Sequence, residues 1–213
     1  WDLQQIKGGM IALPQALVDK VDTRLDSTVT SVATSQTGVS ITVDEKSLEF
    51  DLAVVATTAN ITKQILENKT SGQNDILDGT EYATTVGIGF EVPKDTLGDI
   101  TIVWVPHVES GAISGYTNEV MKGEDMIQGD KSLLLTWFHE DFAKTVINKS
   151  DEEIFETAKK ELIKVCPFIK DTSILKNHDL QRWPEAMPKY KQGHLARAKT
   201  FHDKHQGEQT IFL

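Results

Sequence analysis

The feature that most constrains the fold is the apolar run Leu-Ala-Val-Val-Ala-Thr at residues 52–57, in which apolar and polar residues do not alternate. A run of this kind is typical of a strand in a parallel sheet, where both faces are covered. The run leads into Thr57 and Thr58, and the sequence then predicts a helix around residues 60–68. We therefore expect a buried parallel strand with the two threonines at its carboxyl end.

Most other strand candidates show the opposite pattern. Val39, Ile41 and Val43 alternate strictly with polar residues, which predicts a half-buried strand antiparallel to residues 27–35. A short piece at 47–51 follows. Later strands are predicted at residues 82–92, 99–106, 111–117, 132–140 and 172–180. Short links, several with glycine, join these later strands, which predicts an antiparallel sheet.

The clearest helix begins after Ser150, which forms a predicted capping box with Glu153. Its apolar stripe consists of Ile154, Ala158, Leu162 and Val165, and Pro167 ends it. Another helix is expected within residues 8–21, with Pro14 in its first turn. Residues 69–80 are polar and predict a loop and a domain boundary. Together these patterns predict an α/β (α+β) fold, in which a small α/β piece is followed by a mainly antiparallel sheet with flanking helices.

The composition excludes several classes of function. The 213 residues carry a net charge of −10, which disfavours a nucleic-acid surface. The single cysteine, Cys166, allows no internal disulfide and indicates a reducing compartment, so we expect a cytoplasmic location. No apolar run approaches the roughly 20 residues of a membrane span. Peripheral membrane association stays open, and the sequence does not indicate an oligomeric state.

Few residues point to catalysis by themselves. No Gly-x-Gly-x-x-Gly turn precedes a helix, and neither a phosphate loop nor a Gly-x-Ser-x-Gly elbow is present. His202 and His205 flank Asp203 at helical spacing, but no third ligand is close in sequence, so we expect a solvated helix face and no metal site. Cys166 stands at a helix C-terminus, where the dipole disfavours a thiolate.

The stretch Arg-Trp-Pro-Glu-Ala-Met-Pro-Lys-Tyr-Lys-Gln-Gly-His at residues 182–194 remains as a candidate site. Pro184 and Pro188 predict a rigid loop with Trp183 and Tyr190 beside them. Taken alone, the two aromatic residues would most simply pack over an apolar edge.

Three stretches, in this order, resemble the superfamily of flavin-containing amine oxidases, protoporphyrinogen oxidases and phytoene desaturases. The first runs from Gly-Gly-Met at residues 8–10 through Thr-Val-Thr-Ser-Val to Phe-Asp-Leu-Ala-Val-Val-Ala-Thr-Thr at 50–58. The second is the antiparallel region with its capped helix. The third, residues 182–213, is similar to the family's Trp-x-x-Ala-x-Pro-x-Tyr-x-x-Gly-His pattern, and in the family the following strand leads into a motif that contacts FAD.

The resemblance implies a division of the chain and a set of site residues. Residues 1–59 and 189–213 would form part of an FAD-binding domain, and 60–188 a substrate-binding domain. The backbone of Val29 would face the adenine end of FAD, and Thr57 and Thr58 would also contact the cofactor. Trp183 would border both the flavin and the substrate, and Tyr190 would contact the substrate.

The resemblance also implies an activity, with one departure. Amine oxidases of the family place a lysine in the strand equivalent to 82–92, whereas Thr84 and Thr85 stand here and lysine is absent. We therefore expect a protoporphyrinogen oxidase-like or desaturase-like enzyme that transfers hydride from a hydrophobic or amphipathic small molecule to FAD. No catalytic acid or base can be named.

The ends of the chain add a further expectation. The sequence begins at Trp1 and ends at Leu213 within an apolar strand, so we expect a piece of a longer protein that does not retain FAD alone. The alternatives are a non-catalytic β-rich ligand-binding domain, with the aromatic residues as packing, and a metal hydrolase that uses His202 and His205.

Overall fold

A computed structural model describes residues 6–123, 127, 129–204 and 210–213 of the chain. The chain divides into two compact units. Unit 1 comprises the N-terminal part up to Asp22 together with Ala83–Ala186, and unit 2 comprises Thr23–Tyr82 together with Met187–Leu213.

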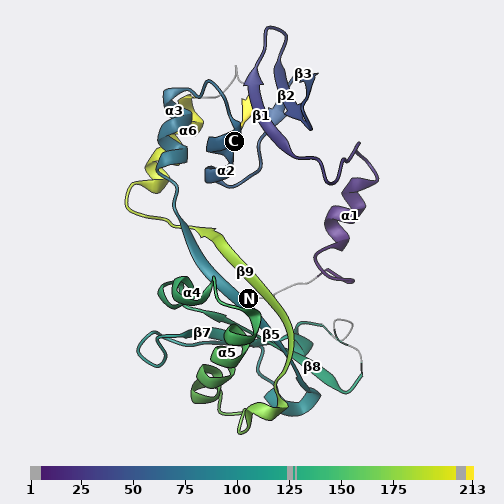
Figure 1. The fold of residues 1–213 in the computed structure, drawn as a ribbon, viewed down its shortest axis with the longest axis vertical. Helices are drawn as coiled ribbons and strands as arrows, with labels where there is room; N and C mark the ends of the chain where they lie inside the picture. Colours follow the sequence, from purple (N-terminus) through teal and green to yellow (C-terminus); the bar gives the residue numbers. More distant parts are fainter. Residues whose placement is uncertain (1–5, 124–126, 128, 205–209) are drawn as a thin grey trace. The chain divides into compact units, whose positions relative to one another are not determined.

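Unit 1 is built on a five-stranded sheet in the order β6-β7-β8-β5-β9 (Figure 1). Its strands are β5 (Tyr82–Pro93), β6 (Ile102–Trp104), β7 (Ile113–Asn118), β8 (Lys131–Phe138) and β9 (Lys176–Pro188). Its helices are α1 (Ala12–Val18), α4 (Glu140–Val146) and α5 (Asp151–Val165), with short 3-10 helices at Lys94–Leu97, Glu119–Lys122 and Thr172–Ile174. The predicted antiparallel pairing is confirmed for β6, β7, β8 and β5.

Alternation along the strands of unit 1 separates a covered face from an open one. In β5 the side chains of Val86, Ile88, Phe90 and Val92 are buried, and their partners across β8 include Leu134. Helices α4 and α5 complete this core from the same side of the sheet. The side chains that α4 and α5 bury are Ala143, Val146, Ile154, Phe155, Ala158 and Leu162.

Helix α5 begins at the predicted capping box. The Glu153 backbone N–H donates to Ser150 Oγ, and the Ser150 N–H donates to the Glu153 carboxylate. The predicted apolar stripe is buried at Ile154 and Leu162. Charged residues on the other faces of this helix form two lysine–glutamate pairs, Lys159 with Glu156 and Lys164 with Glu161.

Unit 2 contains two small sheets and three helices. Strands β1 (Val29–Thr34), β2 (Val39–Val43) and β3 (Lys46–Phe50) form an antiparallel sheet, and β4 (Ala53–Val54) pairs in parallel with β10 (Ile211–Phe212). The helices are α2 (Ala59–Ile65), α3 (Ser71–Asp78) and α6 (His194–Lys204). The parallel pairing of β4 and β10 confirms that residues 52–57 and the last strand share a sheet.

The prediction that residues 52–57 are buried on both faces is wrong. Val55 is buried, but Val54 is 75% exposed and Leu52 is exposed as well. The reason is that, among the described residues, this parallel sheet has only two strands, so neither its faces nor its second edge are fully covered.

The polar stretch at residues 69–80 forms helix α3 rather than the predicted loop. The Gln73 backbone N–H donates to Thr70 Oγ1, and the Thr70 N–H donates to the Gln73 side chain, so a second capping box begins this helix. Leu77 of α3 packs in the core of unit 2, together with Leu66 beyond α2.

The division into compact units differs from the expected domains mainly in two places. Residues 60–82 group with unit 2, whereas the expected boundary places them in the substrate-binding domain. The N-terminal helix α1 groups with unit 1, whereas the expected boundary places it in the FAD-binding domain.

The predicted loop at residues 182–188 is part of strand β9. Prolines are tolerated there because β9 is an edge strand and only one of its sides has a neighbour. Helix α4 differs from the prediction as well, because the strand predicted at residues 132–140 ends at Phe138 and the helix begins at Glu140.

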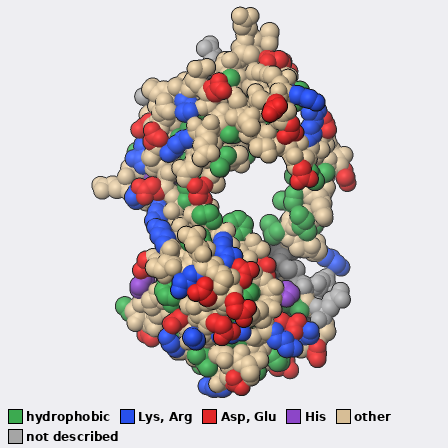
Figure 2. All heavy atoms as spheres, in the orientation of Figure 1, with side chains coloured by type: hydrophobic (Ala, Val, Ile, Leu, Met, Phe, Trp, Pro, Cys, Tyr) green, Lys and Arg blue, Asp and Glu red, His purple; other side chains and the backbone are tan. Residues whose placement is uncertain are grey.

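Two further features concern the helices and the distribution of surface charge. No helix within the described residues is long and apolar enough to cross a membrane. Figure 2 shows Lys and Arg side chains interspersed with Asp and Glu over the visible face, without a continuous basic patch. This face agrees with the net charge of −10.

Candidate functional site

The open face of the unit 1 sheet carries aromatic side chains. Trp104 of β6 and Trp137 of β8 meet edge to face, with ring centroids 5.4 Å apart. Trp104 is 68% exposed, and Trp137 is half-buried. These indoles form an apolar surface that neither α4 nor α5 covers, because both helices pack on the other face.

Gly115 in β7 allows this aromatic surface to form. It is paired with Trp104 on one side and Trp137 on the other. A Cβ added at Gly115 would lie 2.7 Å from Trp137 Cζ2 and 2.7 Å from the Val103 carbonyl oxygen. Glycine is therefore required for the Trp137 ring to lie against the strand.

Trp183 of β9 lies on the same open face. Arg182 points to the helix-covered face, where its guanidinium contacts the loop between α4 and α5. Because successive strand residues point to opposite faces, Trp183 points to the open face. Its side chain is 53% exposed, so the structure leaves much of this indole without a packing partner in unit 1.

Two threonines of β5 donate hydrogen bonds to the strands on either side of β5. The Thr84 hydroxyl donates to the Pro184 carbonyl of β9 over 3.0 Å, and the Thr85 hydroxyl donates to the Phe138 carbonyl of β8 over 3.0 Å. Thr85 belongs to the open-face set of β5, with Gly87 and Gly89. The open face of β5 thus presents small, neutral residues beside the tryptophans.

A histidine pair near the end of β8 was not predicted as a site. The rings of His107 and His139 stack, with centroids 4.6 Å apart and an interplanar angle of 30°. His107 Nε2 donates to Asp141 Oδ2 over 3.0 Å, and this hydrogen bond lowers the pKa of Asp141 below its usual value. Nε2 of His139 is buried and has no hydrogen-bond partner among the described atoms. Sequence spacing did not reveal this pair because 32 positions separate its members.

A recess at the other end of β5 is lined by charged residues. It has a volume of about 210 Å³ and includes Glu91, Lys131 and Lys176 in its wall. Glu91 contacts Lys131 at 2.8 Å and Lys176 at 3.6 Å. The hydrogen bond from Lys131 lowers the pKa of Glu91, so the carboxylate stays ionised and is a poor general base.

Val29, the predicted adenine contact, begins strand β1 in unit 2. It pairs with Val43 of β2, and a register shift follows before Ser31. Within the described residues, the opposite edge of β1 carries one bridge, between Val32 and Leu66. The backbone of Val29 therefore lies at a strand edge, which suits a ligand that pairs with main-chain groups.

Thr57 and Thr58 follow β4 and lead into α2. Their hydroxyls differ in environment, because Thr57 Oγ1 lies 2.8 Å from Thr62 Oγ1, whereas Thr58 Oγ1 is buried without a hydrogen-bond partner in the described chain. The Ala59 N–H at the start of α2 donates to the Tyr82 hydroxyl. A buried hydroxyl costs free energy unless it is satisfied, so Thr58 Oγ1 fits a polar group of a bound ligand.

Tyr190, the predicted substrate contact, belongs to unit 2 and is 74% exposed. Its ring meets the His194 ring edge to face at 5.2 Å. Trp183 and Tyr190 therefore belong to different units, and the structure assigns each of them a local environment only.

The remaining candidates are inert or undescribed. Burial raises the pKa of the Cys166 thiol, and burial also raises the pKa of the neighbouring Tyr116 hydroxyl, so neither group ionises readily. His202 lies beside Asp203, and His205 lies outside the described residues. No group of three or more metal-binding side chains occurs in the part of the chain that the structure describes.

Solved structures share this fold. A putative protoporphyrinogen oxidase from Exiguobacterium sp. 255-15 aligns with a TM-score of 0.78 and 16% identity, over 98% of this chain and 46% of that one. Cyclohexylamine oxidase from Brevibacterium oxydans IH-35A aligns with a TM-score of 0.70 and 11% identity, over 96% and 46% of the two chains. Wild-type putrescine oxidase bound to putrescine aligns with a TM-score of 0.68 and 17% identity, over the same shares of the two chains.

These likenesses show the fold, and the chain spans about half the length of the structures it matches. A search of curated proteins returned no match. The sequence profile of the flavin containing amine oxidoreductases matches residues 2–213. The chain therefore belongs to the flavin-containing amine oxidoreductase family.

Proposed function

We propose that the chain forms the substrate-binding part and a portion of the FAD-binding part of an enzyme that removes hydride from carbon in a hydrophobic or amphipathic small molecule. Unit 1 is the substrate side and unit 2 is the FAD side. Among members of the family, the protoporphyrinogen oxidase-like or desaturase-like branch fits better than the amine oxidases.

The observation that carries this proposal is the chemistry of the open face of unit 1. Trp104, Trp137 and Trp183 give it a broad apolar surface, whereas β5 contributes Thr85 and glycines. A flat apolar molecule would bury area on the indoles, and each Å² of apolar area removed from water contributes about 25 cal/mol. A lysine at β5, which the resemblance leads one to expect in an amine oxidase, is absent.

The residues of unit 2 fit contacts to FAD. The strand edge at Val29 offers main-chain groups to an adenine ring, and the buried Thr58 hydroxyl, with Thr57 beside it, offers a polar contact. Bound FAD would supply the hydride acceptor. The residues of this chain would hold the substrate, exclude water from it and fix its orientation.

Trp183 and Tyr190 are the proposed contacts to substrate. Replacing Trp183 with Ala in the full-length enzyme is expected to lower kcat/KM for protoporphyrinogen by roughly 100-fold, because misplacing a substrate by about 1 Å has an effect of this order. The melting temperature should change little, since half of the indole is already exposed. Activity can be followed by the fluorescence of the porphyrin product.

The Trp183→Phe variant serves as the control that keeps a flat ring. Putrescine and cyclohexylamine should not be turned over by the wild-type enzyme. Turnover of an amine would assign the enzyme to the amine-oxidising branch. A full-length protein that purifies without flavin and oxidises none of these molecules would favour the non-catalytic binding domain instead.

The 213-residue chain by itself is proposed not to retain FAD. A tight site needs a Gly-x-Gly-x-x-Gly turn at a helix N-terminus for the pyrophosphate, and this pattern is absent from the sequence. Each lost hydrogen bond to a charged group is worth about 1.5–3 kcal/mol. We expect a colourless preparation and a dissociation constant for FAD in the millimolar range or weaker, and a micromolar value in a titration would contradict this.

The cytoplasmic location stays a prediction from the single cysteine.

A further inference from the structure

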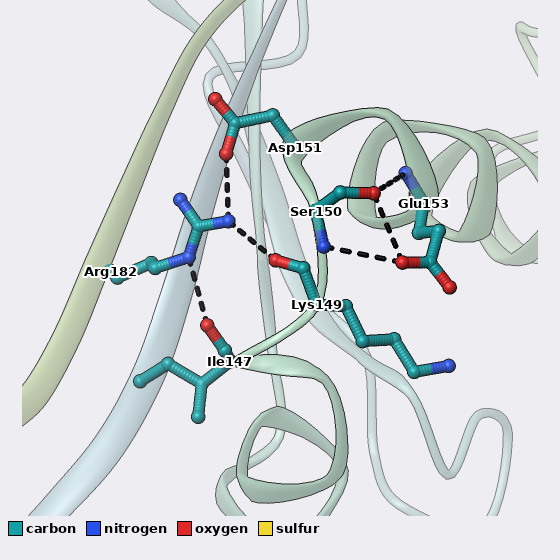
Figure 3. A network of polar contacts seen from close by, with 6 residues as sticks. All are labelled: Ile147, Lys149, Ser150, Asp151, Glu153 and Arg182. Atoms are coloured by element: carbon teal, nitrogen blue, oxygen red, sulfur yellow. Dashed lines mark hydrogen bonds and ion pairs between the residues drawn. The ribbon is translucent and has the colours of Figure 1, made fainter.

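Arg182 connects the strand that carries Trp183 to the helical layer of unit 1. Its Nε donates to the Ile147 carbonyl over 2.8 Å, and its Nη2 donates to the Lys149 carbonyl over 2.8 Å. The same Nη2 lies 2.7 Å from Asp151 Oδ1. Figure 3 shows the guanidinium directed at the loop between α4 and α5, with all three acceptors on that loop or at its ends.

This loop is a well-fixed anchor. Ile147 caps the C-terminus of α4, where carbonyl groups lack helical partners and a cation is favoured. Asp151 is the first residue of α5, and the adjacent Ser150–Glu153 capping box fixes the start of that helix (Figure 3). Both helices are buried against the sheet, so the loop cannot shift without disturbing the core.

Strand β9 needs such an anchor more than its neighbours do. It lies at the edge of the sheet, so backbone pairing holds it on one side only. Pro184, immediately after Trp183, has no N–H to contribute to that pairing. Within the described structure, two sets of side-chain contacts hold residues 182–184. The Thr84 hydroxyl donates to the Pro184 carbonyl, and the Arg182 guanidinium contacts the α4–α5 loop.

We propose that Arg182 is a positioning residue for Trp183. Its guanidinium fixes β9 to the α4–α5 loop on the covered face, and this fixes the Trp183 indole on the open face, one residue further along the strand. Arg182 does not itself reach the open face. The effect on catalysis rests on the proposed function of Trp183, whereas the effect on the indole position does not.

The first test uses the full-length protein labelled with 5-fluorotryptophan. The Trp183→Phe variant assigns the Trp183 resonance by its disappearance. Arg182→Met should shift or broaden that resonance while those of Trp104 and Trp137 stay in place. Arg182→Lys should give an intermediate change, because an ammonium keeps the charge but cannot direct two nitrogens at three fixed acceptors.

Ser150→Ala is the matched control, because it removes the cap of α5 but keeps every acceptor of Arg182 and the buried residues that hold both helices in place. It should lower the melting temperature as Arg182→Met does and leave the Trp183 resonance unchanged. An unchanged Trp183 resonance in Arg182→Met would overturn the proposal, and so would an equal shift in Ser150→Ala.

The second test separates this inference from the proposed function. With protoporphyrinogen as substrate, Arg182→Met should raise KM roughly tenfold. The same change made in the Trp183→Ala background should add little. If Trp183→Ala itself leaves the kinetics unchanged while the resonance moves in Arg182→Met, the proposed role of Trp183 fails and the positioning role stands. If Trp183→Ala alters the kinetics and Arg182→Met changes neither KM nor the resonance, the positioning role fails by itself.

Discussion

The sheet cores of units 1 and 2 differ in how completely they are covered, whereas helix α1, which groups with unit 1, buries no residue. In unit 1 the sheet and two helices enclose fully buried side chains such as Phe90, Phe138 and Ile154. In unit 2 the core is small, and Phe50 and Val54 are exposed on its strands. Unit 1 therefore has a hydrophobic core of its own, whereas the parallel strands of unit 2 keep apolar area in contact with solvent.

The comparison has a functional side as well. In unit 1, helices cover one face of the sheet, and the other face, with Trp104 and Trp183, is exposed. Unit 2 offers a strand edge at Val29 and a buried Thr58 hydroxyl that has no hydrogen-bond partner within the described residues. Unit 1 therefore suits a small molecule that needs apolar contact area. Unit 2 suits a ligand that needs contacts to main-chain groups and a hydroxyl.

The largest expected effect tests the difference in burial with the same substitution in both units. Phe90→Ala should lower the free energy of unfolding by about 3–5 kcal/mol, because a fully buried aromatic side chain is removed. Phe50→Ala, at a side chain that is 46% exposed, should lower it by about 1 kcal/mol. Urea unfolding measures both values, with tryptophan fluorescence for unit 1 and circular dichroism for both units, because the sequence of unit 2 contains no tryptophan. Equal losses would show that unit 2 is as tightly packed as unit 1.

Sequence patterns predicted unit 1 better than unit 2 for a physical reason. Alternation and a Ser-x-x-Glu box are local signals, and β8 and α5 follow them closely. In unit 2, the stretch before Asp78 contains Ser, Gly and Asn, whose low helix propensity hid α3. The Thr70–Gln73 capping box is the local pattern from which α3 could have been predicted.

The candidate site was only partly accessible from sequence. Trp183 could be named from its motif, but its placement on the open face depends on β9 continuing through Pro184, which the edge position of that strand permits. The stacking of His107 on His139 and the contact of Arg182 with Ile147 join residues more than 30 positions apart. Such contacts arise from the register of the sheet and have no local sequence pattern.

The two capping boxes provide a comparison of intermediate size. Ser150→Ala in unit 1 and Thr70→Ala in unit 2 each remove an acceptor for a backbone N–H in the first turn of a helix. Loss of such a cap costs about 0.5–2 kcal/mol. Thr70→Ala should fall at the upper end of this range because its partner Gln73 is buried, whereas the Ser150 box is exposed. Thermal unfolding of both variants measures the difference, and a larger loss for Ser150→Ala would reverse the expected order.

The smallest expected effect concerns acid stability and compares one exposed carboxylate in each unit. Hydrogen bonds from Ser150 lower the pKa of Glu153 in unit 1, and hydrogen bonds from Ser40 and then Ser35 lower the pKa of Glu49 in unit 2. In each case the folded pKa lies below the ordinary value of 4.5, so the unfolded chain binds more protons in the window below that value. The stabilisation is therefore complete above pH 4.5 and is lost as the pH falls through the folded pKa.

Glu153→Gln and Glu49→Gln should each flatten the decline of stability between pH 5 and pH 3. Glutamine at residue 153 can still complete the capping box, so Glu153→Gln should change the slope with pH more than the stability at pH 7. Urea midpoints measured at half-unit pH steps, with each unit followed by amide hydrogen exchange, assign each change to its unit. A flattened decline in both units for a single substitution would show that the units unfold together, and it would remove the energetic distinction between them.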